Sequence, residues 1–335
     1  MARSRLLLAA AAAAAGLGTA GTAAAATIAY TSLGSSSSHV WVMRGDGSEK
    51  ERLTAGSVVD VAPSLSPAGT RLVFVRRLAD DRDDLYRIGV NGTGLRRLTQ
   101  TAVAETAPVW SPAGGLIAFS AGAGAGASEI VLLEPDGSGR RRLTRNGVDD
   151  LDPAWAPSGT FLAFTRLVGG ANAEVYVVRT DGKGLRRLTN RPGADDSPDW
   201  SSTGWIAYVR RLAGGSEIRA VRRNGTGDRL VFRSARHLGS PTWSPNGASL
   251  VFELWDGVDT ELYRVSAAGK ALRRLTRNDV NDFGPVWGPG GSRIAFTRLS
   301  GGGNDVWTIR ADGTGPKRLT TAATHEAVGA WGAGP

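Results

Sequence analysis

Carboxylates recur at a fixed place in this sequence, three residues before a repeated proline. The series is Asp60, Glu105, Asp150, Asp195 and Asp282, and Glu326 stands at the matching place before Gly329. Only Leu238 breaks the series, and His237 lies beside it. Carboxylates gathered in one place can bind a cation such as Ca²⁺, serve as general acid and base, or pair with arginines. The choice depends on where the fold puts them.

Arginines form a second series that matches the first. Each stands two residues after the aromatic residue of an apolar run: Arg76, Arg166, Arg210 and Arg298. Ser32, Ala121 and Leu254 fill the same place in the other copies. Two interpretations stay open. Acids and arginines could together form a charged surface that binds a peptide or a sugar polymer, or each acid could pair with a neighbouring arginine and tie the fold together.

An internal repeat indicates which elements carry these residues. Arg-Leu-Thr ends at Thr54, Thr99, Thr144, Thr189, Thr276 and Thr320, with a degenerate copy at Arg229-Leu230-Val231. The leucines follow one another at intervals of 42 to 45 residues. A period of about 40–45 residues with strand-like segments is typical of one propeller blade per repeat.

One repeat predicts four strands, over residues 107–110, 116–119, 129–133 and 140–144. Ser-Pro and Asp-Gly pairs separate them and favour tight turns. A tryptophan stands two residues after the proline in five copies, at 110, 155, 200, 243 and 287, and we expect these rings to pack between blades. The acids precede the innermost strands and the arginines end the second strands. Both series are therefore expected on one face, around one mouth of a central channel.

The ends of the chain are predicted to complete the ring. Six repeats are complete, the C-terminal stretch offers one further first strand, and residues 27–54 offer the three strands that would follow it. Pairing of the two ends leaves only short, protected edges. We therefore predict an all-β, seven-bladed β-propeller, with six blades and a loose partial one as the alternative.

The first 26 residues read as a secretory signal peptide. Arg3 and Arg5 precede an apolar run from Leu6 to Leu17, and an Ala-rich cleavage site ends at Ala26. An uncleaved membrane anchor is the alternative. Residues 27–335 are then one propeller domain with no transmembrane segment, exported to the periplasm, the cell wall or the medium. We expect it to be a monomer.

The repeated unit resembles the TolB-like repeat, a WD-repeat-like propeller module of bacterial envelope and secreted proteins. The resemblance rests on Pro-x-Trp-Ser-Pro-x-Gly from Pro108, Ile-Ala-Phe from Ile117, Asp136-Gly137, and Arg-Arg-Leu-Thr from Arg141. It covers the chain after residue 26 and implies a propeller. That family includes envelope scaffolds, propeller domains of peptidases and a few lyases. The usual acid of the Ser-Pro-Asp-Gly turn is replaced here, for example by Ala113.

Composition and motifs favour binding over catalysis. The chain has no Cys and only three His, and it contains no G-x-S-x-G elbow, H-E-x-x-H motif or P-loop. We expect a non-enzymatic scaffold without a cofactor, although Ca²⁺ at the acids is an open alternative. A propeller-type polysaccharide lyase or glycosidase that uses mouth carboxylates is the enzymatic alternative. An enzyme should differ from a scaffold in one or two irregular blades. The fourth and fifth repeats, with Trp205, His237 and Trp255, are the most irregular ones.

The formal net charge of +9 limits the kinds of partner that the protein could bind. Arginine pairs such as Arg186-Arg187 and Arg222-Arg223 fall on or near the outermost strands. They could hold an anionic envelope polymer or act as a solvated edge that prevents sheet-to-sheet association. Because no series of base-stacking aromatics accompanies them, we expect a protein or an anionic polymer as partner and no nucleic acid.

Overall fold

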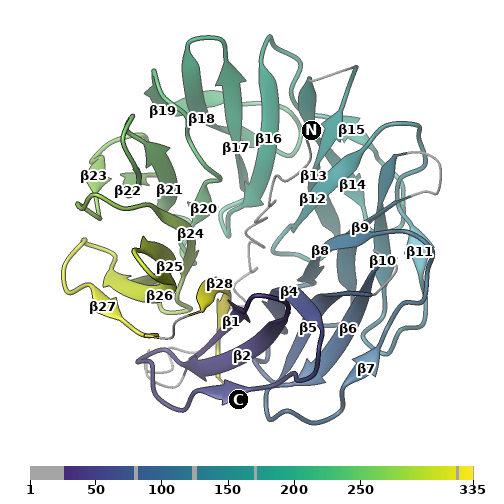
Figure 1. Ribbon diagram of the computed structural model, residues 1–335. Helices are drawn as coiled ribbons and strands as arrows, with labels where there is room; N and C mark the ends of the chain where they lie inside the picture. Colours follow the sequence, from purple (N-terminus) through teal and green to yellow (C-terminus); the bar gives the residue numbers. More distant parts are fainter. Residues whose placement is uncertain (1–25, 79–81, 123–126, 170–171, 322–323, 335) are drawn as a thin grey trace, which may run out of the picture.

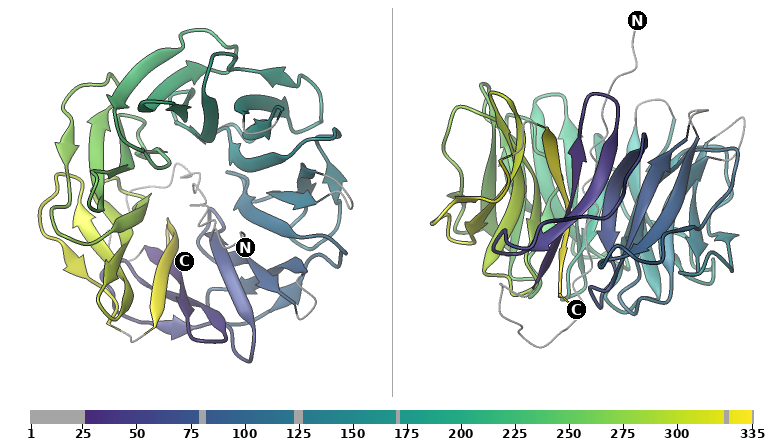
Figure 2. Two further views of the ribbon diagram at one scale, coloured as in Figure 1. Left: turned by 45° about the horizontal axis from the view of Figure 1, so that its top comes forward. Right: turned by 60° about the horizontal axis from the view of Figure 1, so that its bottom comes forward.

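Sheets arranged around one axis form the whole of the described structure (Figures 1 and 2). The computed structural model describes residues 26–78, 82–122, 127–169, 172–321 and 324–334. These ranges hold 28 strands. Within them, no helix has the length and apolar character needed to cross a membrane. The predicted signal peptide lies outside the described residues except for Ala26.

Five antiparallel sheets have four strands each and are called blades below. Their first strand lies next to the axis and their fourth at the rim (Figure 1). The first blade contains β8 (Glu105–Trp110), β9 (Ile117–Gly122), β10 (Ser128–Leu133) and β11 (Arg141–Arg142), and the second contains β12 (Asp150–Trp155), β13 (Phe161–Leu167), β14 (Ala173–Arg179) and β15 (Arg186–Arg187). The third contains β16 (Ala194–Trp200), β17 (Trp205–Leu212), β18 (Gly215–Arg222) and β19 (Arg229–Ser234), and the fourth contains β20 (Thr242–Trp243), β21 (Ser249–Trp255), β22 (Thr260–Ser266) and β23 (Arg273–Arg274). The fifth contains β24 (Asp282–Trp287), β25 (Arg293–Ser300), β26 (Gly303–Arg310) and β27 (Lys317–Arg318).

The remaining eight strands form a single sheet, called the closing sheet. It contains β28 (His325–Gly332), β1 (Thr27–Leu33), β2 (Ser38–Arg44), β3 (Glu51–Arg52), β4 (Val59–Leu65), β5 (Arg71–Arg77), β6 (Asp83–Gly89) and β7 (Arg96–Arg97). The strand order is β28-β1-β2-β4-β5-β6-β7, with β3 paired to β2. Strand β28 pairs with β1 from Thr27 opposite Gly332 to Leu33 opposite His325. The two ends of the chain therefore meet in one sheet.

The prediction of seven blades is wrong, and so is the alternative of six. Five four-stranded blades stand around the axis, and the eight strands of the closing sheet join the ends of the chain. Two repeat-length units become one sheet because β2 and β4 pair in parallel at Ser38 and Val59. The Ser38 hydroxyl also donates to the carbonyl oxygen of Asp60 at 2.7 Å. The predicted pairing between the C-terminal strand and the first N-terminal strand is present.

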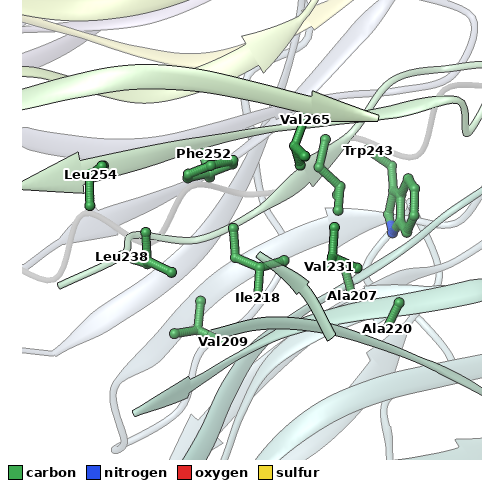
Figure 3. Close-up of a cluster of buried hydrophobic side chains, with 11 residues drawn as sticks. Ala207, Val209, Ile218, Ala220, Val231, Leu238, Trp243, Phe252, Leu254 and Val265 are labelled. Atoms are coloured by element: carbon green, nitrogen blue, oxygen red, sulfur yellow. The ribbon is translucent and has the colours of Figure 1, made fainter. Parts of the chain in front are cut away.

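The core lies between neighbouring sheets. The aromatic residue of the second strand is fully buried in each blade, and Phe252 is the example in Figure 3, where it packs with Ile218 and Leu238. The predicted packing of the tryptophans between sheets is confirmed for three of them. Their indole N–H donates to a carbonyl oxygen of the preceding repeat: Trp110 to Ser64, Trp155 to Val109 and Trp287 to Thr242, at 3.0–3.1 Å.

The Arg-Leu-Thr motif fastens the outer strand to the third strand. In the copy at residues 187–189, Arg187 Nε donates to the Thr189 carbonyl oxygen at 2.6 Å. The Thr189 hydroxyl accepts the Val175 backbone N–H at 2.9 Å. In the degenerate copy, Val231 is the buried residue, whereas Leu230 is 44% exposed. The predicted equivalence of Leu230 with the other leucines is therefore wrong by one residue, because the pairing of β18 with β19 shifts between Ile218 and Arg219.

A bulge interrupts most inner strands directly before the repeated proline. The bulge residue has a positive φ of 51–62° at Ala62, Ala107, Asp152, Ser197 and Gly284. In β12 the pairing with β13 shifts between Leu151 and Ala154. A bulge re-aims the side chains on either side of it. The inner strands β8, β12, β16 and β24 can thus each carry an acid near the start and a tryptophan at the end.

Candidate functional site

Four of the predicted acids pair with the four predicted arginines. Each arginine donates twice to one carboxylate, at 2.6–2.8 Å, in the pairs Asp60–Arg76, Asp150–Arg166, Asp195–Arg210 and Asp282–Arg298. All four acids are fully buried. The partners face each other across the first and second strands of the same repeat, as Asp150 and Arg166 do. Such two-point contacts fix geometry as well as charge.

Aromatic rings hold these guanidinium groups from the side. The central carbon of Arg166 lies 4.5 Å from the centroid of the Tyr176 ring, and that of Arg298 lies 4.5 Å from Trp307. Arg76 lies 4.7 Å from Tyr86 in the same way. The hydrogen bonds that Arg76 donates to Asp60 raise the pKa of Arg76 above its usual value. The arginines are therefore charged, stacked and held in place.

The other two acids have no such partner. Glu105 lies opposite Ala121 and accepts hydrogen bonds from the hydroxyls of Thr99 and Thr101. Burial raises its pKa, while Thr99 and Arg140 act in the opposite direction. Glu326 lies opposite Ser32, and burial raises its pKa as well. Both positions lack an arginine in the sequence at the end of the second strand.

A second series of buried acids was missed from the sequence. Asp84, Glu174, Glu261 and Asp305 lie on the third strands. They form ion pairs with the arginine of Arg-Leu-Thr, namely Arg97, Arg187, Arg274 and Arg318. A signal was available, because each acid precedes its arginine by 13 residues. The pairing neutralises three arginines of the predicted basic rim, Arg97, Arg187 and Arg274.

Asparagines link the two acid series across neighbouring sheets. Asn146 Nδ2 donates to Glu129 of one blade at 3.1 Å and to Asp150 of the next at 2.8 Å. Asn278 Nδ2 makes the same bridge between Glu261 and Asp282, at 3.4 and 2.9 Å. At these two junctions, acids, arginines and an asparagine are therefore joined by hydrogen bonds across neighbouring sheets. The interpretation in which the acids pair and tie the fold together describes these contacts.

The blade β20–β23 lacks both the inner-strand acid and its arginine, and it exposes a tryptophan. In β20–β23 the arginine position holds Leu254, which bridges to Leu238. The neighbouring Trp255 is 43% exposed, and the His237 ring lies 6.2 Å from it. The Arg236 guanidinium carbon lies 5.9 Å from the same ring. We call Arg236, His237, Trp255 and the exposed Val258 the Trp255 patch.

No metal centre is apparent in the described ranges. No group of three or more His, Asp and Glu side chains there is arranged to hold a metal ion. Asp149, Asp150 and Asp152 lie close together in the sequence but make separate contacts. Asp149 accepts the Ser128 backbone N–H at 2.6 Å, and Asp150 is paired with Arg166. Asp152 stands apart, because burial and the charge of Asp196 raise its pKa to about 6.

Comparison with known proteins points to one family. A family model described as the TolB beta propeller domain matches residues 20–225 and 197–334. No protein in the curated set that was compared matches the chain. Among solved structures, a putative TolB from Agrobacterium tumefaciens is 19% identical with a TM-score of 0.55, over 90% of this chain and 98% of that one.

Two further structures share the fold at low identity. TolB from Acinetobacter baumannii is 15% identical with a TM-score of 0.61, over 92% of this chain and 82% of that one. An oligogalacturonate lyase in complex with manganese is 12% identical with a TM-score of 0.64, over 87% of this chain and 84% of that one. Because TolB proteins and a lyase share this architecture, function must be argued from the site.

Proposed function

The chain belongs to the TolB beta-propeller family, and we propose that it is a non-catalytic, exported scaffold that binds a partner on one face. We place the binding surface on the face where the inner strands begin, called the entry face. The partner is a protein or an anionic polymer of the envelope. The chain would act in the periplasm, in the cell wall or outside the cell.

The observation that carries the proposal is the exposed Trp255 in an otherwise repeated frame. An exposed tryptophan beside an arginine is typical of the residues that contribute most to binding. The indole offers a large apolar surface, and its N–H offers a donor. The other repeats fold without this ring, with Leu299 at the same place in β25. Trp255 is therefore not required by the fold.

The acid–arginine pairs support the same proposal in a different role. Asp60, Asp150, Asp195 and Asp282 are buried, so we propose that they and Arg76, Arg166, Arg210 and Arg298 hold the entry face rigid. Glu105 and Glu326 complete that ring. A rigid surface binds with less loss of conformational entropy than a mobile one. Direct contact with the partner is assigned to His237 and its neighbours in the Trp255 patch.

The experiment is a thermal-shift panel on residues 27–335 with Ca²⁺, a chelator, wall polymers, and acidic and neutral oligosaccharides. A ligand of the folded state raises the melting temperature. The shift should persist in Leu299→Ala, the matched control, and disappear in Trp255→Ala. A shift that both variants keep would place binding elsewhere. If no compound gives a shift, a protein partner becomes the remaining form of the proposal, and envelope proteins bound by Leu299→Ala but not by Trp255→Ala would identify it.

One observation favours a second candidate function. Asp152, with its pKa raised to about 6, neighbours Asp196, which is paired with Arg211. Two carboxyls in unlike environments are what a glycosidase or lyase needs. A lyase would convert acidic oligosaccharides into unsaturated products with strong ultraviolet absorbance. Such activity that Asp152→Asn abolishes would replace the scaffold proposal, and its absence would leave the scaffold proposal standing.

A further inference from the structure

Four arginines gather on the face opposite to the entry face. They are Arg186 of β15, Arg222 at the end of β18, Arg223 directly after it, and Arg229 of β19. Arg222 and Arg229 stack on Trp205 at the start of β17, whereas Arg210 lies toward the other end of that strand. We call Arg186, Arg222, Arg223, Arg229 and Trp205 the arginine cluster. It spans two neighbouring blades (Figure 1).

Aromatic rings fix the positions of these charges. The guanidinium carbons of Arg222 and Arg229 lie 3.9 and 4.5 Å from the centroid of the Trp205 ring. Arg223 lies 4.2 Å from the ring of Phe161, which belongs to the preceding blade. Arg186 reaches the turn after β18, where a Cβ added to Gly225 would lie 3.2 Å from Nη2. Stacking holds a guanidinium group but leaves its positive charge in place.

No carboxylate of the described residues forms an ion pair with any of the four. Asp228, the nearest acid in sequence, is bound to Arg219 and to the Tyr208 hydroxyl. Arg222 donates to a backbone carbonyl, that of Thr203, at 2.7 Å. Burial and the charge of Arg222 lower the pKa of Arg229. The cluster thus concentrates like charges that the protein itself does not neutralise.

The same positions in other repeats show that the fold does not need this arrangement. Among the matching strand-end arginines, Arg44 and Arg179 have carboxylate partners, Glu49 and Asp181. The position of Trp205 holds Arg293 in β25, opposite Arg310. In the blades β12–β15 and β16–β19, the second strand begins with an aromatic residue, Phe161 or Trp205, on which an arginine stacks. The departures from the repeat therefore coincide at one place.

We propose that the arginine cluster is a binding site for a phosphate group. Guanidinium groups offer paired N–H donors that match phosphate oxygens, and they remain charged at any physiological pH. A phosphate group would bridge the neighbouring guanidiniums and neutralise their repulsion. The group could belong to a soluble phosphate compound or to a lipid headgroup. This inference is independent of the partner on the entry face.

The test measures binding of phosphate in two forms to residues 27–335. One arm titrates inorganic phosphate and pyrophosphate by calorimetry. The other arm sediments the protein with phosphatidylglycerol vesicles, using phosphatidylcholine vesicles for comparison. Binding in the first arm identifies a site for soluble phosphate, and binding to phosphatidylglycerol alone identifies a headgroup site. Both forms should weaken as salt concentration rises, because the contact is ionic.

Variants assign the binding to the cluster. Arg222→Gln and Arg223→Gln should each weaken binding about tenfold or more, as expected for the loss of one charged hydrogen-bonding group. Arg310→Gln is the matched control, because it removes an arginine at the same strand position without the aromatic rings, and it should bind as the wild type does. Circular dichroism melting would establish that each variant is folded. No binding in either arm overturns the proposal, and so does an equal loss in Arg310→Gln, which would indicate diffuse charge.

Discussion

Asp195 and Arg210 form the most deeply buried of the acid–arginine pairs, with the Arg210 side chain 5% exposed. Their neighbours Asp196 and Arg211 form a more exposed pair, with the Arg211 side chain 42% and the Asp196 side chain 19% exposed. Water screens an exposed pair, whereas a buried carboxylate without its partner is strongly disfavoured. The two adjacent pairs therefore offer a direct comparison of burial at nearly constant position.

We predict that Arg210→Met destabilises the protein by about 3–5 kcal/mol, because it leaves Asp195 buried and unpaired. The exposed counterpart, Arg211→Met, should cost about 1 kcal/mol or less. Urea unfolding followed by tryptophan fluorescence measures both. Equal losses in the two variants would show that burial does not govern the strength of these pairs.

Asp199 gives the molecule a second kind of buried acid. It accepts the backbone N–H of Trp243 in the neighbouring blade at 2.7 Å. Burial raises its pKa from 3.8 to about 7, against the effect of the hydrogen bonds from Trp243 and Trp200. The folded state therefore keeps this proton to higher pH than the unfolded state does. Stability contributed by the neutral carboxyl is full below pH 4 and falls as pH rises toward 7.

Asp199→Asn should remove that dependence on pH, because the amide is neutral and its oxygen can still accept the Trp243 N–H. Relative to the wild type, the variant should gain unfolding free energy between pH 4 and pH 7. The gain is limited to roughly 4 kcal/mol, at about 1.4 kcal/mol per pKa unit. Denaturant unfolding at several pH values measures the difference. A constant difference over this range would mean that Asp199 is ionised in the folded protein throughout.

At the scale of elements, the turns between first and second strands have nearly the same backbone conformation but pack against different parts of the molecule. Gly69 and Gly159 both adopt a positive φ, +69° and +68°. A Cβ on Gly69 would lie 1.7 Å from the carbonyl oxygen of Ala333, in the segment that follows β28. A Cβ on Gly159 would find Pro112 Cδ at 3.8 Å. Only the first turn packs against the C-terminal segment.

We predict that Gly69→Ala destabilises the protein more than Gly159→Ala does. Both variants carry the cost of a positive φ, about 1–2 kcal/mol. Gly69→Ala must in addition displace the backbone at Ala333, directly after β28. Thermal unfolding compares the two, and limited proteolysis should release C-terminal residues faster from Gly69→Ala. Identical melting temperatures would show that this contact is dispensable.

Strands and turns followed closely from the repeat, while contacts between repeats did not. The predicted third strand at 129–133 is β10 (Ser128–Leu133), because apolar runs between turn residues specify strands locally. The fourth strand, predicted over 140–144, is reduced to Arg141–Arg142. The acid–arginine pairing was one of two interpretations that the spacing allowed. The third-strand acids were missed because the arginines that pair with them were interpreted as exposed rim charges, although each acid stands 13 residues before its arginine.

At the scale of the whole molecule, the repeat fixed the ring architecture but not the number of sheets. Whether two repeats remain separate depends on contacts such as the single parallel pairing of Ser38 with Val59, which no sequence period encodes. The residues that break the repeat mark candidate sites on both faces of the ring. His237 and Trp255 broke the pattern on one face, and Trp205 with its arginines broke it on the other. A near-symmetric frame makes such departures easy to recognise.

The pairing of β1 with β28 also determines how the ring would respond to mechanical force. Thr27 and Gly332 face each other at one end of an antiparallel pair. A load applied through these two residues would separate the strands one hydrogen-bonded pair at a time, as a zipper opens, and would never share the load along their length. Tension between Thr27 and Gly332 is therefore opposed by only one hydrogen-bonded pair at a time.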